Sequence, residues 1–149
     1  MIIAVKEVGK ELQLVDTDEK YRGACVKKYT GMDYFVEYVP LKEDGTLNIG
    51  VNEDGLRLEL PTNFLVSMNN PHWPIQKMVG TVVFVRHKLI NPYEKVIWDF
   101  EVESLTDDDI KLIRRLVSDD VQEWLKSQFV DYGRGYAIIE PFERIKMGD

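Results

Sequence analysis

The sequence predicts one α+β domain: a mainly antiparallel sheet of about six to eight strands, with two or three helices packed on one face of it. Between residues 94 and 129 the hydrophobic period changes from two to about 3.6, which indicates a strand followed by a helix. Two acidic turns, Asp44-Gly45 and Asp54-Gly55, each precede an apolar segment and favour hairpins. With 149 residues, 44% of them hydrophobic, the chain can bury one core, and no linker divides residues 1–149.

Short strands and turns dominate the first half of the chain. Gly9-Lys10 is predicted to form a two-residue hairpin turn, with the glycine at positive φ. Asp16 or Thr17 can cap a helix that runs to about Tyr29 and stops at Thr30-Gly31. The expected strands cover residues 2–8, 11–15, 34–41, 47–51 and 56–60. The last two of these strands would continue an antiparallel meander.

The second half of the chain contains the clearest periodic patterns. Residues 79–87 are apolar on both faces at their centre, which predicts an interior strand. A turn at residues 91–94 leads into a strand over residues 96–103, whose apolar positions alternate with mostly acidic ones. A last strand is expected over residues 137–140.

A capped helix is predicted after residue 105. Thr106 is a good N-cap, and the three aspartates at positions 107–109 favour the positive end of the helix dipole. A second cap-like cluster at Ser118-Asp119-Asp120 indicates two helices rather than one. The apolar positions that recur at helical spacing are Ile110, Ile113, Val117, Val121 and Trp124.

Charge and cysteine content narrow the class of partner. The net charge of −7 argues against direct nucleic-acid binding and favours a protein partner with a basic surface. The single cysteine, Cys25, rules out an internal disulfide and a cysteine-rich zinc site. We expect Cys25 in the core of a protein of the reducing cytoplasm. We expect no signal peptide, no membrane-spanning helix, no metal and no cofactor.

Tyr132, Arg134 and Tyr136 form the most ligand-like group in the sequence. Glycines at positions 133 and 135 would let backbone amides approach an anion, Arg134 could bind a phosphate, and the tyrosines could stack on a base. A glycine-rich turn entering a strand explains the same pattern.

Two further groups are candidates for contact with a partner protein. His72 and Trp73 lie between two prolines, which would restrain an exposed indole, although the indole could equally fold back over the core. Asp99, Glu101 and Glu103 share one strand face and could imitate the phosphates of nucleic acid; the alternative is an ordinary solvated face.

Three segments together resemble a family of uncharacterised small proteins of phages, plasmids and other bacterial mobile elements. They read NEDG at residues 52–55 followed by LPTN at 60–63, VGTVV at 79–83, and SLTDDDI at 104–110. The resemblance ends near residue 113, so the part from about residue 114 would be an extension. The family has no established activity, and the resemblance therefore implies a mobile-element origin and no particular chemistry.

These observations lead to three alternative functions. The first is a non-enzymatic accessory protein of a phage or mobile element that binds and inhibits a host protein, including a component of a defence system. The second is a binder that sequesters a nucleotide-like signal, as an oligomer. The third is an enzyme, which we rank last because the residues form no acid–base, nucleophilic or metal pattern.

Overall fold

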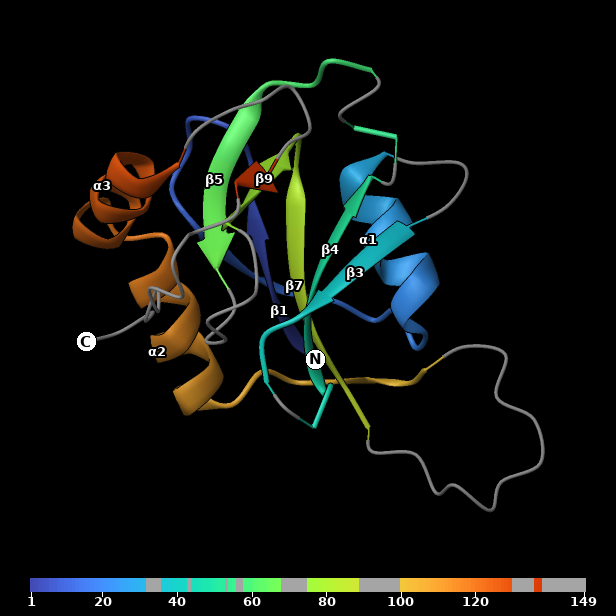
Figure 1. The fold of residues 1–149 in the computed structure, drawn as a ribbon. Coiled ribbons are helices and arrows are strands. Elements are labelled where there is room, and N and C mark those ends of the chain that lie inside the picture. Colours follow the sequence, from blue (N-terminus) through green and yellow to red (C-terminus); the bar gives the residue numbers. More distant parts are fainter. Residues whose placement is uncertain are drawn as a thin grey trace.

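Two antiparallel sheets share one hydrophobic core in the structure (Figure 1). It is a computed structural model that describes residues 1–31, 36–42, 44–52, 54–55, 58–67, 75–88 and 100–129, together with the backbone of residues 136–137. The predicted α+β class is confirmed, with three helices and a mainly antiparallel larger sheet.

The larger sheet has six strands among the described residues, in the order β2-β1-β7-β4-β3, with β8 paired to β7. All of its pairings are antiparallel. Its strands are β1 (Ile2–Lys6), β2 (Gln13–Asp16), β3 (Val36–Pro40), β4 (Leu47–Asn52), β7 (Val82–His87) and β8 (Val102–Glu103).

The smaller sheet has the order β5-β6-β9, and it lies on one face of the larger sheet. Its strands are β5 (Thr62–Ser67), β6 (Ile75–Val79) and β9 (Tyr136–Ala137). The helices are α1 (Arg22–Thr30), α2 (Asp107–Leu116) and α3 (Asp119–Gln128).

The helices cover both faces of the larger sheet, so the prediction that they cover one face is wrong. In Figure 1, α1 lies on the opposite side of the larger sheet from α2 and α3. The reason is the strand β7, which is buried on both faces: Val82 and Phe84 point one way, and Val83 and Val85 the other. A strand with two apolar faces needs cover on each of them.

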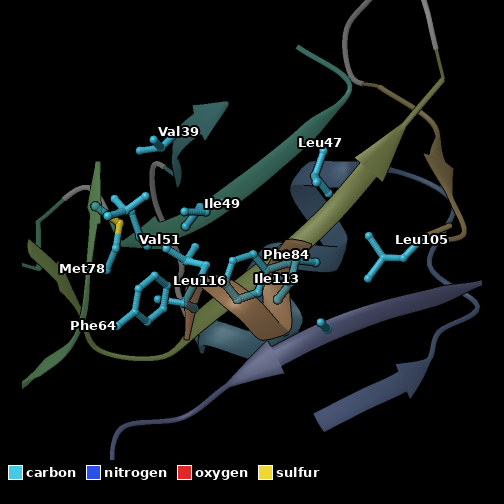
Figure 2. Close-up of a cluster of buried hydrophobic side chains, with 13 residues drawn as sticks. Val39, Leu47, Ile49, Val51, Phe64, Met78, Phe84, Leu105, Ile113 and Leu116 are labelled. Atoms are coloured by element: carbon cyan, nitrogen blue, oxygen red, sulfur yellow. The ribbon is translucent and has the colours of Figure 1, made fainter. Parts of the chain in front are cut away.

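The main core lies between the two sheets and α2. The rings of Phe64 on β5 and Phe84 on β7 stack with their centroids 5.7 Å apart, which joins the smaller sheet to the larger one. Burying each large apolar side chain of this kind contributes about 1.5–3 kcal/mol. The residues labelled in Figure 2 are Val39, Leu47, Ile49, Val51, Phe64, Met78, Phe84, Leu105, Ile113 and Leu116.

A second core lies between α1 and the other face of the larger sheet. Cys25 and Val26 of α1 are fully buried there, against Ile3 and Val83. The helix crosses β4 at Gly50, where an added Cβ would lie 2.8 Å from the methyl carbons of Val26. The absence of a side chain at this position lets the helix approach the strand closely.

The helix α3 packs on the outer face of the smaller sheet and closes one edge of it. Leu125 is buried against Leu65 and Ile75. The side-chain amide of Gln122 accepts from the Leu65 N–H at 2.8 Å and donates to the Leu65 carbonyl at 2.9 Å. It also donates to the Leu116 carbonyl at 2.8 Å, which ties the end of α2 to the start of α3.

Several local predictions are confirmed. The strands β1 and β2 pair as a hairpin, with Gly9 at φ 73°, and Gly31 ends α1 at φ 70°. β3 and β4 form the expected hairpin across Gly45. The helical segment divides at Ser118 into α2 and α3.

Two predicted boundaries in the first half are wrong. The link between β1 and β2 is longer than two residues, because β1 ends at Lys6 and β2 begins at Gln13. The helix α1 starts at Arg22 rather than after Asp16 or Thr17. The chain stays extended up to Tyr21 because it pairs there with the segment before β8, through the Tyr21–Glu101 bridge.

The predicted meander and the single strand over residues 79–87 also differ from the structure. Glu59 has φ 55°, and residues 58–59 form a turn instead of adding a strand beside β4, while residues 56–57 lie outside the described residues. Gly80, at φ 71°, then separates β6 from β7. As a result β4 pairs with β7, and β5 and β6 form the second sheet.

The remaining strand predictions lie partly outside the described residues. Residues 32–35, 89–99 and 138–149 are among those not described. Within the described part, the strand predicted over residues 96–103 appears as β8, and the last predicted strand as β9.

The capping box at the start of α2 gives a direct test of this helix boundary. The Thr106 hydroxyl accepts from the Asp109 N–H at 3.1 Å, and the Asp109 carboxylate accepts from the Thr106 N–H at 2.8 Å. We expect Thr106→Ala to lower the free energy of unfolding by about 1 kcal/mol, because one capping acceptor is lost.

Ser118→Ala is the matched control, since Ser118 is the N-cap of α3 but makes no side-chain cap hydrogen bond. Urea denaturation of both variants measures the difference. Equal unfolding midpoints for the two variants would contradict a capping role for Thr106.

Candidate functional site

Most of the site residues predicted from the sequence lie outside the described part of the structure. These are His72, Trp73, Asp99, Tyr132 and Arg134. The backbone of Tyr136 belongs to β9, opposite Gln76 on β6, and its side chain is not described. The ligand site at Tyr132, Arg134 and Tyr136 and the partner contact at His72 and Trp73 therefore stay predictions.

The two described members of the acidic strand face lie next to cations of the same chain. The Glu101 carboxylate binds Lys88 Nζ at 3.0 Å and Lys20 Nζ at 3.6 Å. The hydrogen bond from Lys88 lowers the pKa of Glu101. Glu103 lies opposite Arg86 in the β7–β8 register. Because its charges are partly neutralised within the chain, this face is a weaker imitation of phosphate than its sequence indicates.

Among the described residues, a partly buried polar network connects the β3–β4 hairpin, β7 and α2. We call it the Asp109 cluster; its members are Lys42, Asp44, Thr46, Arg86 and Asp109. Asp109 stands at its centre and is fully buried. Its charge therefore has to be matched by partners within the protein.

Three residues hold the Asp109 carboxylate. Arg86 Nε binds Oδ2 at 2.6 Å and Arg86 Nη2 binds Oδ1 at 2.9 Å, a two-point contact that fits the planar guanidinium. Lys42 Nζ binds Oδ1 at 2.6 Å, and the Thr106 N–H binds Oδ2. Burial alone would raise the pKa of Asp109, but the hydrogen bonds from Arg86, Lys42 and Thr106 hold it well below its ordinary range.

The cluster extends from Arg86 to the hairpin turn. Arg86 Nη1 donates to the Thr46 hydroxyl at 3.2 Å, and that hydroxyl donates to Asp44 at 2.7 Å. The Thr46 hydroxyl lowers the pKa of Asp44, and the Asp109 carboxylate raises the pKa of Arg86. Since Asp109 accepts from four donors, it is arranged to hold these elements together rather than to abstract a proton.

A column of stacked planar groups begins at His87, the residue after Arg86 on β7. Because successive residues of a strand point to opposite faces, it lies on the other face of the larger sheet from the Asp109 cluster. The His87 ring stacks on Phe100 at 4.5 Å between centroids. The Arg22 guanidinium lies 4.3 Å from the Phe100 ring centroid and 3.6 Å from that of Tyr38. The column joins the start of α1 to β3 and to the end of β7, and its contacts identify His87 as a packing residue.

Cys25 is a core residue, as expected. Its side chain is fully buried in α1, and burial raises the pKa of the thiol to about 11. A thiol in this state is protonated at neutral pH and is a poor nucleophile. Among the described residues, no group of three or more histidine, cysteine or acidic side chains is arranged to hold a metal ion.

The exposed face of α3 is the surface that the sequence analysis missed. Trp124 was expected on the apolar side of a helix, but 43% of it is exposed. It shares one face with Asp120, Glu123 and Ser127, which are also exposed and recur at helical spacing. We call these four residues the outer α3 stripe.

The inward face of α3 explains why the prediction for Trp124 was wrong. Gln122 and Leu125 occupy the buried side, where Gln122 binds the backbone of Leu65. A hydrophobicity pattern predicts Trp124 in the core and Gln122 in solvent. In the structure Gln122 is buried instead, because its side chain hydrogen-bonds the backbone of β5.

No family model, no curated protein and no solved structure matches this chain. The resemblance to small phage and plasmid proteins therefore stays a prediction. None of the helices in the described residues has the length and apolar character needed to cross a bilayer.

The Asp109 cluster predicts a specific dependence of stability on pH. Asp109→Asn should lower the free energy of unfolding at pH 7 by about 3–5 kcal/mol, because it leaves Arg86 and Lys42 without their shared carboxylate. The native pKa of Asp109 is lowered, so its contribution is complete above the unfolded-state pKa of about 4 and is lost as the pH falls further.

Urea denaturation of wild type and Asp109→Asn from pH 7 down to pH 3 checks this. The difference in the free energy of unfolding between the two proteins should become smaller as the pH falls. Asp108→Asn is the control, because Asp108 is exposed in the same helical turn. If the difference in the free energy of unfolding did not change with pH, Asp109 would not be an ionised, paired carboxylate in the native protein.

Proposed function

We propose that this protein is a non-enzymatic binding protein that engages a basic surface on a host protein and inhibits it, as an accessory of a phage or other mobile element. The observation that carries the proposal is the exposure of Trp124 on the outer α3 stripe. Tryptophan is among the residues most enriched in the energetic centres of protein interfaces.

The rigidity of α3 supports this role. Leu125 and two hydrogen bonds of Gln122 fix the inward side of the helix to the smaller sheet, and the third hydrogen bond of Gln122 fixes it to the end of α2. An aromatic side chain on an ordered helix loses little backbone freedom on binding, so more of its contact energy appears as affinity.

The charges around Trp124 indicate the chemistry of the partner. Asp120 and Glu123 flank the indole on the same face, and the chain as a whole carries a net charge of −7. A partner with an apolar pocket rimmed by lysine or arginine would match both features. Such a rim also binds phosphates, so covering it would block access of a nucleic-acid substrate. The resemblance to phage and plasmid proteins supports a host protein as the partner.

The test measures binding to a partner captured from bacterial lysate and then purified. We expect Trp124→Ala to raise Kd roughly 30-fold or more, which corresponds to a loss of about 2 kcal/mol at the centre of an interface. The double variant Asp120→Lys/Glu123→Lys should slow association and reverse its dependence on salt.

Leu58→Ala is the matched control, because Leu58 is 51% exposed and lies in the turn before β5. Trp124→Ala and Leu58→Ala should show wild-type unfolding midpoints, and the double variant should show a small decrease because Asp120 lies in the first turn of α3. A captured partner that binds Trp124→Ala with wild-type affinity would remove the outer α3 stripe from the interface.

A further inference from the structure

The strand β2 forms an edge of the larger sheet, and among the described residues it pairs only with β1 (the outer of the two blue strands in Figure 2). Met1 and Thr17 exchange both backbone hydrogen bonds. Along an antiparallel ladder, hydrogen-bonded pairs alternate with non-hydrogen-bonded pairs. The pairs Ile3–Val15 and Val5–Gln13 are therefore also hydrogen-bonded. The N–H and C=O groups of Leu14 and Asp16 therefore point away from β1.

This edge lacks three of the features that usually prevent strand addition, although it is short and carries the exposed Asp16. Between Gln13 and Asp16 there is no proline, no lysine and no bulge, and Leu14 is an apolar residue that is 42% exposed. Other edges differ: β3 ends at Pro40, and the side chain of Gln122 occupies the edge of β5 at Leu65.

We propose that β2 pairs antiparallel with β2 of a second copy of this chain, with Leu14 opposite Leu14 on a twofold axis. The larger sheet would then continue across the dimer, and each copy would offer the same surface to the other. This interaction is separate from the outer α3 stripe and does not rest on the proposed function.

Charge complementarity selects this register. With the segments flanking β2 aligned in the same register, Lys10 of one copy would lie level with Asp18 of the other, twice across the axis. Both side chains are largely exposed, and Lys10 would exchange its present partner Glu7, and Asp18 its present partner Lys28, for the new pair. A register with Asp16 opposite Asp16 would place like charges face to face. The intermediate register, with Leu14 opposite Asp16, would separate the two exposed leucines and lose the Lys10–Asp18 pairs.

The length of the strand sets the expected strength. A four-residue edge buries less than the roughly 1,200 Å² typical of stable interfaces, so the dimer should form only as the concentration rises. In hydrogen exchange followed by NMR, the amides of Leu14 and Asp16 should gain protection with concentration. The amides of Gln13 and Val15, which already bond to β1, should be protected throughout.

Sedimentation over a concentration series tests the proposal with the full chain. Wild type should shift from monomer to dimer, Leu14→Glu should remain monomeric, and the control Leu58→Glu should behave like wild type. Lys10→Asp and Asp18→Lys should each weaken the dimer several-fold, and the double variant should recover it because the pairs are restored with opposite sign.

Three results would overturn the proposal. They are a wild type that is monomeric at every concentration, a dimer that survives Leu14→Glu, and concentration-independent protection of Leu14 and Asp16. The last result would mean that another segment of the same molecule covers the edge. Because Leu14→Glu could unfold the chain, circular dichroism accompanies it, and the charge-swap variants test the same register without changing Leu14.

Discussion

The Asp109 carboxylate lies where three separate stretches of chain meet: the β3–β4 hairpin, the end of β7 and the first turn of α2. It accepts from Lys42, Arg86 and Thr106, so one buried charge connects the larger sheet to the helix that covers its core. A buried carboxylate with this many donors adds less net stability than its short distances indicate, because removing three charges from water is costly. Its stronger effect is on geometry, since any other position of α2 would leave Arg86 and Lys42 without their common partner.

The position of α2 in turn determines the rest of that face. Ile113 and Leu116 fill the core beneath it, and α3 follows directly and reaches the outer side of β5. The exposure of Trp124 is thus a consequence of how Gln122 and Leu125 are held. The charged network and the candidate binding face belong to one continuous arrangement.

The predictability of the elements from sequence depends on the range of the interactions that form them. The capping box at Thr106 and the glycine end of α1 were predictable because their signals lie within a few residues. The burial of Asp109 was not, because its partners Lys42 and Arg86 are distant in the chain and three successive aspartates read as a solvated cap. The second sheet was missed for a related reason: Gly80 and Glu59 turn the chain through local backbone conformations that hydrophobic periodicity does not record.

The pairing of β1 with β7 has a consequence for the synthesis of this protein. Ala4 lies beside Phe84, so the amino-terminal hairpin leaves the ribosome long before its central neighbour in the sheet exists. During that interval both edges of the β1–β2 hairpin are unpaired, and the loop that must close between Ala4 and Phe84 contains about half of the chain. The nascent hairpin therefore cannot join the larger sheet until β7 has been synthesised, past the midpoint of the chain.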